Sequence, residues 1–407
     1  MPSDPVHFDL APGFHATAVA CGLKPGGALD LALISADGPC AAAGVFTTNR
    51  VQAAPVLYDR EVLGRDPAGI RAVIANAGCA NACTGERGMA AAGHMAALAA
   101  RAVGCEPGQV LVLSTGVIGR HLDMEKVERG IAALGSPAAE RGAGAATRAI
   151  LTTDTKPKTA TGDFEVPGDR NAGRIAIRGF AKGAGMIHPG LATMLAVVTT
   201  DADLAPEALQ TALASAVARS FNRVSVDGDM STNDTVLLLA SRTSRVRLDA
   251  AGLAAFTGAL TGACASLARQ IARDGEGATR LIEITVTGAR DEAEAHVVAD
   301  TIARSPLVKT AVHGADPNWG RVLAAAGYSG APIDPDRLAL DFGAPDEAIA
   351  VVRGGLPADY DAPAASALLR RDPVILRLDL GRGAGAATVW TCDFSAEYVA
   401  INAHYTT

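Results

Sequence analysis

Short apolar runs alternate with turn residues along the first part of the chain. Between residues 14 and 75, such runs occur at 28–34, 41–46, 54–57 and 72–74. Runs of this length, bounded by glycine, proline or asparagine, are typical of buried strands. The pattern therefore predicts a β-rich beginning.

Longer segments farther along carry apolar residues at helical spacing. They predict helices at residues 87–103, 125–134, 206–221, 253–273 and 291–305. Buried strands are predicted at residues 110–113, 193–200, 236–240 and 281–286, and paired strands at 164–166 with 174–177 and at 374–380 with 387–392. Helices and strands thus alternate along the chain, which indicates mixed α and β content.

A glycine-rich loop leads directly into one of these strands near the middle of the chain. Residues 182–190 contain three glycines and a proline, so they form neither a regular helix nor a regular strand. Residues 193–200 are apolar and β-branched, as in a buried strand. This arrangement presents the hydroxyl of Thr193 at the mouth of a strand. The simpler interpretation is a strand preceded by a glycine turn.

A threonine hydroxyl is a weak nucleophile unless a base lies beside it. Cleavage of the Ala192–Thr193 bond would give Thr193 a free α-amino group that can act as this base. An α-amine titrates at about 7.7–8.0, so an appreciable fraction is neutral near neutral pH. The small residues before Thr193 would allow the strained geometry that attack on the preceding carbonyl needs.

Four other positions carry candidate chemistry. The strand at 110–113 opens into Thr115 and Gly116, whose hydroxyl and N–H can form an oxyanion-binding pair; an ordinary capping turn is the alternative. Lys182 precedes the glycine loop and could hold a substrate carboxylate, although most lysines are solvated surface charges. Glu276 lies between two glycines, where a carboxylate can reach an amine or act as acid or base, or can be a solvated turn residue.

Composition narrows the classes of partner. The 407 residues include 36 basic and 43 acidic side chains, a net charge of −7 without long runs, which argues against nucleic acid or an anionic membrane as partner. No segment reaches the roughly 20 apolar residues of a membrane span, and no signal region is expected at the N-terminus. Seven scattered cysteines suit a reducing cytoplasm. Cys79 and Cys83 are too few ligands for structural zinc, so no metal is expected.

Two other polar clusters resemble known motifs without completing them. Residues 227–234 resemble the opening of a calcium loop, but Thr232 and Leu238 replace its glycine and glutamate. We interpret the segment as a polar loop that supports the site. His313 and Asp316 invite a triad interpretation, yet the sequence has no G-x-S-x-G elbow. We interpret their loop as a packing or subunit-contact feature.

The stretch KGAGMIHPGLATML (182–195) is similar to the self-cleavage and nucleophile signature of the ornithine acetyltransferase family of arginine biosynthesis, also called glutamate N-acetyltransferase. Further matching stretches follow in order: GVFTTNRVQAAPV (44–56), STGVIG (114–119), LTTDTKPK (151–158), FNRVSVDGDMSTNDT (221–235), RDGEGATR (273–280), KTAVHGADPNWGRVLAAAG (309–327) and INAHYTT (401–407). The resemblance implies an α+β fold with two β layers sandwiched between helices, autoprocessed into an alpha fragment, 1–192, and a beta fragment, 193–407.

The resemblance also assigns residues. It implies self-cleavage between Ala192 and Thr193, with Thr193 as the nucleophile. The implied oxyanion hole is formed by Thr115 and Gly116. The implied substrate contacts are Thr152, Lys182, Thr193, Glu276, Asn402 and Thr407. Thr153 remains an alternative to Thr152. Cys79 and Thr406 depart from the residues expected at their positions, and the departure at Thr406 leaves the contacts of the C-terminal tail open.

The activity implied by the resemblance is transfer of the acetyl group of N2-acetylornithine to glutamate, giving ornithine and N-acetylglutamate. No cofactor is implied, and acetyl-CoA is a second candidate donor that the sequence does not decide. The family forms assemblies with two of each fragment, and a cytoplasmic location is expected. The alternatives are an N-terminal-nucleophile aminopeptidase of related fold, which hydrolyses instead of transferring, and a metabolite-binding protein with an uncleaved chain.

Overall fold

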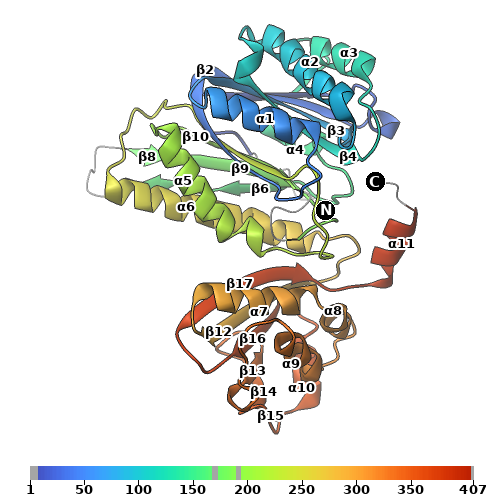
Figure 1. The fold of residues 1–407 in the computed structure, drawn as a ribbon, viewed down its shortest axis with the longest axis vertical. Coiled ribbons are helices and arrows are strands. Elements are labelled where there is room, and N and C mark those ends of the chain that lie inside the picture. Colours follow the sequence, from blue (N-terminus) through green and yellow to red (C-terminus); the bar gives the residue numbers. More distant parts are fainter. Residues whose placement is uncertain (1–7, 167–172, 189–193, 405–407) are drawn as a thin grey trace.

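The computed structural model describes residues 8–166, 173–188 and 194–404. The chain forms two bodies stacked along the long axis of the molecule (Figure 1). A nine-stranded sheet belongs to the larger body and a six-stranded sheet to the smaller one. The C-terminal helix leads back from the smaller body toward the larger one.

The nine-stranded sheet is built around one long strand. Its strands are β1 (Phe14–Val19), β2 (Leu31–Phe46), β3 (Ile70–Cys79), β4 (Val110–Val117), β5 (Glu140–Arg141), β6 (Lys158–Thr161), β9 (Ile177–Lys182), β10 (Leu195–Thr200) and β11 (Thr235–Ala240), and β7 (Phe164–Glu165) pairs separately with β8 (Arg174–Ile175). The main path runs β4-β3-β2-β11-β10-β9-β6. The first part of β2 pairs with β1 and β3, and residues 41–46 pair with β11, so β2 joins two halves of the sheet.

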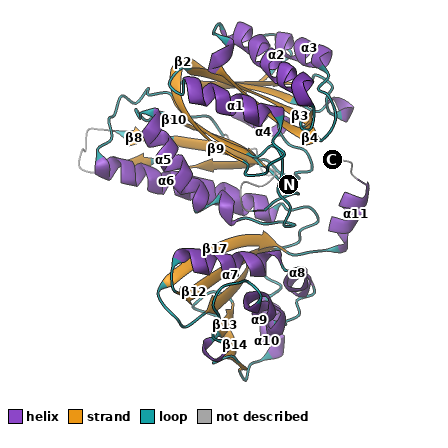
Figure 2. Ribbon diagram, in the orientation of Figure 1, coloured by secondary structure: helices purple, strands orange, loops and turns teal. Residues whose placement is uncertain are grey.

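These two halves face each other across an apolar core. The larger body has helices α1 (Ala54–Arg65), α2 (Gly85–Val103), α3 (Met124–Ala133), α4 (Ala143–Ala149), α5 (Pro206–Ala218) and α6 (Ala250–Arg273). Alternate strand residues point to opposite faces, so Val73 and Leu237 belong to the apolar core between the halves, while Ile74 belongs to the core on the outer face. α2 and α3 cover one outer face, and α5 and α6 cover the other (Figure 2). The predicted α+β class is confirmed, with the layer order helices, sheet, sheet, helices.

The smaller body has its own core. Its sheet runs β15-β14-β13-β16-β12-β17. Its elements are β12 (Leu281–Ala289), α7 (Glu292–Arg304), α8 (Pro306–His313), α9 (Trp319–Gly327), β13 (Ala339–Phe342), β14 (Ile349–Arg353), β15 (Leu356–Pro357), α10 (Ala362–Leu368), β16 (Val374–Asp379) and β17 (Gly385–Cys392), followed by α11 (Ala396–His404). Apolar residues of this sheet and of α7–α10 form one cluster separate from those of the larger body. The hydrophobic pattern alone does not indicate that these elements form a second body.

Two segments differ from the predicted elements. Residues 54–57 begin helix α1 instead of forming a strand, since Pro55 lies in the first helical turn, where its missing N–H costs nothing. The runs predicted at 28–34 and 41–46 belong to the single strand β2, which continues through an irregularity between Ser35 and Cys40. Local turn residues such as those at 37–39 therefore interrupt the pairing without ending the strand.

Helix α6 is unusually long and apolar. Among the described residues, it is the one helix long and apolar enough, by length and composition, to cross a membrane. Its apolar residues, among them Phe256, Leu260 and Leu267, lie instead in the core against the sheet.

Candidate active site

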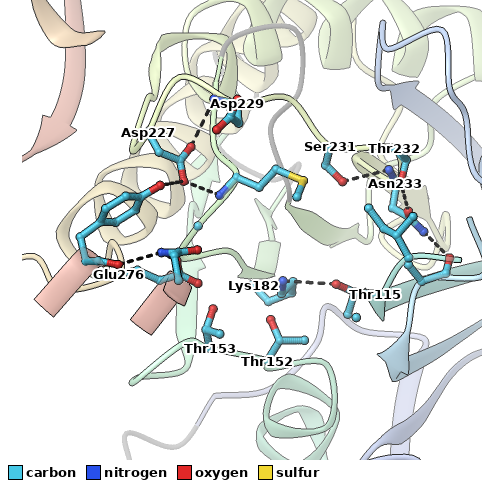
Figure 3. A pocket seen from close by; sticks show the side chains of 17 residues that line it. Thr115, Thr152, Thr153, Lys182, Asp227, Asp229, Ser231, Thr232, Asn233 and Glu276 are labelled. Carbon is cyan, nitrogen blue, oxygen red and sulfur yellow. Dashed lines mark hydrogen bonds between the residues drawn. The ribbon is translucent and has the colours of Figure 1, made fainter. Parts of the chain in front are cut away.

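One cavity collects side chains from segments far apart in the sequence. It lies where β4 and β9 end and where the loop before β11 passes (Figure 3). The residues that line it are Ala80, Thr115, Gly116, Ile118, Thr152, Thr153, Lys182, Gly185, Met186, Asp227, Asp229, Ser231, Thr232, Asn233, Glu276, Tyr398 and Asn402. All six described site residues of the sequence prediction are among them: Thr115, Gly116, Thr152, Lys182, Glu276 and Asn402. Ala192, Thr193, Thr406 and Thr407 lie outside the described residues.

Gly116 follows Thr115 at the end of β4, and its backbone requires glycine. Its φ is +129°, and a Cβ atom added there would lie 2.4 Å from the carbonyl carbon of Gly78 on β3. Thr115 is buried, with 4% of its surface exposed. The close approach of the two strands therefore fixes where the Thr115 hydroxyl and the Gly116 backbone enter the cavity.

Lys182 ends β9 with its ammonium group buried in the cavity wall. Its Nζ donates to Thr115 Oγ1 at 3.3 Å (Figure 3). A lysine ammonium has no acceptor, so Thr115 Oγ1 receives this bond and its own hydroxyl proton stays available for another acceptor. Burial lowers the pKa of Lys182, and the carboxylates of Asp154, Asp234 and Glu276 oppose this shift.

Glu276 is buried, so the solvated-turn interpretation is wrong for it. Its exposed fraction is 7%, its backbone N–H donates to Ala184 O at 2.8 Å, and its Oε2 accepts from Asn402 Nδ2 at 2.9 Å. A Cβ atom at Gly185 would lie 2.3 Å from the Glu276 carboxylate. Gly185 thus leaves the space that lets this carboxylate lie against the loop before the predicted cleavage position.

Both candidate threonines at the start of the 152–158 segment reach the cavity. Thr152 and Thr153 both line it, and Figure 3 shows them on the same side as Lys182. The backbone N–H of Thr152 donates to Asp154 Oδ2 at 3.2 Å. Position within the cavity therefore does not choose between Thr152 and Thr153.

Asp227 is a cavity residue whose contacts sequence reasoning missed. Its carboxylate accepts from the backbone N–H groups of Met186 at 2.6 Å and Ile187 at 2.8 Å, and from the Tyr398 hydroxyl at 3.3 Å. Burial raises the pKa of Asp227, and these backbone donors oppose the shift. The incomplete calcium-loop pattern at 227–234 was the available signal, because it marked a polar loop near the site.

Asp234 lies fully buried beside the strand that follows position 193. Its Oδ1 accepts from the backbone N–H of Met194 at 3.0 Å. Burial raises the pKa of Asp234 well above its ordinary value, and Met194 N–H and Lys182 act in the opposite direction. One carboxylate thus fixes Met194, the residue that directly precedes β10.

Other predicted features lie away from the cavity. His313 Nδ1 lies 2.7 Å from Asp393 Oδ2, so its hydrogen-bond partner is Asp393. Residues 380–384 connect β16 to β17, but the predicted pairing of these two strands as a hairpin is wrong, because β12 lies between them and pairs with both. Cys79 and Cys83 are free thiols. Within the described ranges, no group of three or more His, Cys, Asp or Glu side chains is arranged to hold a metal ion.

Comparison with known proteins decides the family. A model described as the ArgJ family matches residues 15–407. This chain belongs to the ArgJ family. The arginine biosynthesis bifunctional protein ArgJ of Thermosynechococcus vestitus is 45% identical to it, over 98% of this chain and 97% of the relative. That of Symbiobacterium thermophilum is 47% identical, over 97% of each.

One solved structure of an ArgJ family protein also matches this ArgJ family member. The crystal structure of arginine biosynthesis bifunctional protein ArgJ from Bacillus halodurans is 44% identical, with a TM-score of 0.49. The match covers 51% of this chain and 98% of the solved chain.

Proposed function

We propose that this ArgJ family protein transfers the acetyl group of N2-acetylornithine to glutamate, through an acetyl group held on Thr193. Relatives 44–47% identical over nearly the whole chain are named arginine biosynthesis bifunctional proteins. The observation that carries the proposal is the meeting of six residues in one cavity, although they come from separate segments between 115 and 402. Both the family and the cavity therefore support an acetyltransferase of arginine biosynthesis.

In the proposed mechanism, self-cleavage between Ala192 and Thr193 first frees the α-amino group of Thr193. This amine takes the Thr193 hydroxyl proton as the oxygen attacks the acetyl carbonyl of acetylornithine. The Thr115 hydroxyl and the Gly116 N–H stabilise the oxyanion. The C–N bond then breaks, the proton passes to the departing nitrogen, and ornithine leaves.

Glutamate accepts the acetyl group in the second half-reaction. Its amine attacks the acetyl ester, the tetrahedral oxyanion uses the same donors, and Thr193 Oγ1 leaves with a proton. Lys182 is suited to a substrate carboxylate, since its ammonium is buried in the cavity wall. Glu276 with Asn402 is suited to a substrate amine.

The remaining roles follow from the family resemblance. Thr152 or Thr153, together with Thr407, completes the substrate pocket. The alpha fragment, 1–192, and the beta fragment, 193–407, assemble as two of each in the cytoplasm. The proposed chemistry needs neither a cofactor nor a metal, and acetyl-CoA is a second candidate donor to glutamate.

The deciding experiment follows the acetyl group. Purified protein is given acetylornithine labelled in its acetyl group, with and without glutamate, and N-acetylglutamate and free acetate are measured separately. Transfer to glutamate faster than release of acetate supports the proposal, and ping-pong kinetics are expected. Acetate as the main product would favour the hydrolytic aminopeptidase alternative, and a parallel assay with acetyl-CoA and glutamate tests the second donor.

A further inference from the structure

A buried chain of charges lies directly behind the cavity wall. Lys158 Nζ lies 2.6 Å from Asp154 Oδ1 and 2.6 Å from Asp274 Oδ2. The side chains of Lys158 and Asp154 are 1% and 0% exposed, and that of Asp274 is 10% exposed. None of the three lines the cavity. We call Asp154, Lys158 and Asp274 the ion triad.

Each member of the ion triad lies next to a segment that carries a proposed substrate-binding residue. Asp154 accepts from the backbone N–H of Thr152 at 3.2 Å and of Gly183, the residue after Lys182, at 2.6 Å. Asp274 lies two residues before Glu276. Lys158 on β6 pairs with the residue before Lys182 on β9.

Asp274, the second carboxylate of the triad, binds the backbone of the same segment, 152–158, farther along. Asp274 Oδ2 accepts from the backbone N–H groups of Thr155 at 3.0 Å and Lys156 at 3.3 Å. The segment 152–158 is thus held at its start by Asp154 and at its middle by Asp274, and both carboxylates contact Lys158 at its end. Breaking one member of such a pair leaves an uncompensated buried charge, so the triad is costly to disturb.

We propose that the ion triad is the positioning element of the acetyl-transfer site and that its Asp154 keeps Lys182 in the charged form that binds a substrate carboxylate. This inference rests on the proposed function. It adds to it a set of residues that do not touch the substrate but determine both the geometry and the charge of those that do.

The charges around Lys182 support the role of Asp154. Asp154, Asp234 and Glu276 raise the pKa of the buried Lys182, and Asp154 has the largest effect of the three. Lys158 and Lys24 are the neighbouring cations. Burial alone would raise the pKa of Asp154, but Lys182, Lys158 and the Gly183 N–H lower it below its ordinary value. Asp154 is therefore an anion, and its bond to the N–H of Gly183 at 2.6 Å holds it beside the backbone of Lys182.

Two matched substitutions separate charge from position. Asp154→Asn and Asp274→Asn each remove one of the two carboxylates at 2.6 Å from Lys158 Nζ. Asp274 is not among the groups with the largest influence on the pKa of Lys182. Both variants should lower kcat/KM for acetylornithine by about tenfold, the usual worth of a hydrogen bond to a charged group. Asp154→Asn alone should also change the pH profile.

The sign of that change follows from the lost anion. Without Asp154 the pKa of Lys182 falls further, so Lys182 loses its proton at lower pH. The alkaline limb of kcat/KM, which reports the free enzyme, should move to lower pH in Asp154→Asn and stay at the wild-type position in Asp274→Asn. Asp154→Glu retains the charge, and its limb should also stay at the wild-type position.

The result that overturns the inference is an alkaline limb of Asp154→Asn that superimposes on that of the wild type, or an equal displacement in both asparagine variants. Thermal unfolding of each variant verifies that the folded protein is compared. If wild-type protein transfers no acetyl group to glutamate, it is the proposed function that fails. The pH dependence of ornithine binding, measured by calorimetry without turnover, then compares the same variants.

Discussion

At the scale of single residues, the Thr115 hydroxyl can accept one hydrogen bond and donate another. Thr115 Oγ1 accepts from Lys182 Nζ at 3.3 Å, which leaves its own proton free to stabilise an oxyanion. Thr115→Val should therefore lower kcat by about 10²–10³-fold, as loss of one oxyanion donor does. Steady-state transfer from acetylornithine to glutamate measures this. Thr257→Val, which removes a hydroxyl bonded to the α6 backbone, is the control and should retain wild-type kcat; a Thr115→Val enzyme as fast as this control would contradict the assignment.

Asp59 is a buried carboxylate that accepts a single hydrogen bond among the described residues. It lies on α1 with no exposed surface, and its Oδ1 accepts from Val112 N–H at 2.7 Å. Its Oδ2 has no hydrogen-bond partner among the described residues. Burial raises the pKa of Asp59 well above its ordinary value. The unfolded chain therefore releases this proton at a lower pH than the folded protein does, and stability falls as pH rises from the unfolded-state pKa toward the folded-state pKa.

The prediction for Asp59→Asn follows from that sign. The variant should be more stable than wild type by about 1–3 kcal/mol at neutral pH, and the difference should shrink in acid, where the wild-type carboxyl is protonated. Urea unfolding at neutral and at acidic pH measures the free energy of unfolding of both proteins. Asp30→Asn is the contrasting variant: Asp30 accepts from four backbone N–H groups, at residues 21–24, and its substitution should destabilise the protein. Lower stability of Asp59→Asn at neutral pH would contradict the account.

At the scale of elements, the spacing of apolar residues predicts the individual helices and not the way in which distant strands pair. The helices at 87–103 and 253–273 correspond to α2 and α6, because apolar residues recur at helical spacing within each segment and a C-cap residue, Gly104 or Asp274, follows it directly. The length of β2 and the second body depend on pairing between distant strands, which no local run encodes. The apolar runs therefore predict most of the helices and strands, whereas the arrangement of the strands into two sheets is seen only in the structure.

The candidate site divides in the same way. Family motifs placed six cavity residues, but the stretch LTTDTKPK (151–158) gave no indication that Lys158 is buried. Its burial depends on Asp274, which is 116 positions away in sequence. Asp227 was recognised as part of a supporting loop, whereas its bonds to Met186 and Tyr398 depend on contacts across the fold. The sequence thus predicts that such polar residues lie near the site, but it does not predict their hydrogen-bond partners.

Helix α11 brings two side chains to the cavity without contributing to the core. None of its residues is buried, yet Tyr398 and Asn402 line the cavity. Ending the chain after Ser395 should cost less than about 1 kcal/mol of stability and lower kcat/KM for acetylornithine by at least about a hundredfold, since two hydrogen bonds to carboxylates are lost. Thermal unfolding and transfer kinetics measure the two effects.

A substitution on the outer face of the same helix serves as the control for this truncation. Val399 is 67% exposed and does not line the cavity, so Val399→Ser should retain both stability and kcat/KM. A truncated protein that still transfers the acetyl group at the wild-type rate would show that α11 does not complete the pocket.

At the scale of the whole molecule, the two proposed fragments share one sheet. β10, in the proposed beta fragment, pairs over six residues with β9 of the alpha fragment and over six residues with β11. β11 in turn pairs with β2. Thr115 and Lys182 belong to one fragment, and Glu276 and Asn402 to the other, so the cavity needs both. Cleavage before Thr193 would therefore leave a single folded unit.

This arrangement predicts opposite results in native and denaturing conditions. Active protein should give two bands on a denaturing gel, while the fragments elute together in native gel filtration, because separating them would break the β9–β10 and β2–β11 pairing. Thr193→Ala should give one band at 41.2 kDa, the mass of the whole chain, and no transfer activity. Mass spectrometry of the smaller fragments locates the cut. Active wild-type protein in which residues 192 and 193 are still joined would remove the free amine on which the proposed mechanism depends.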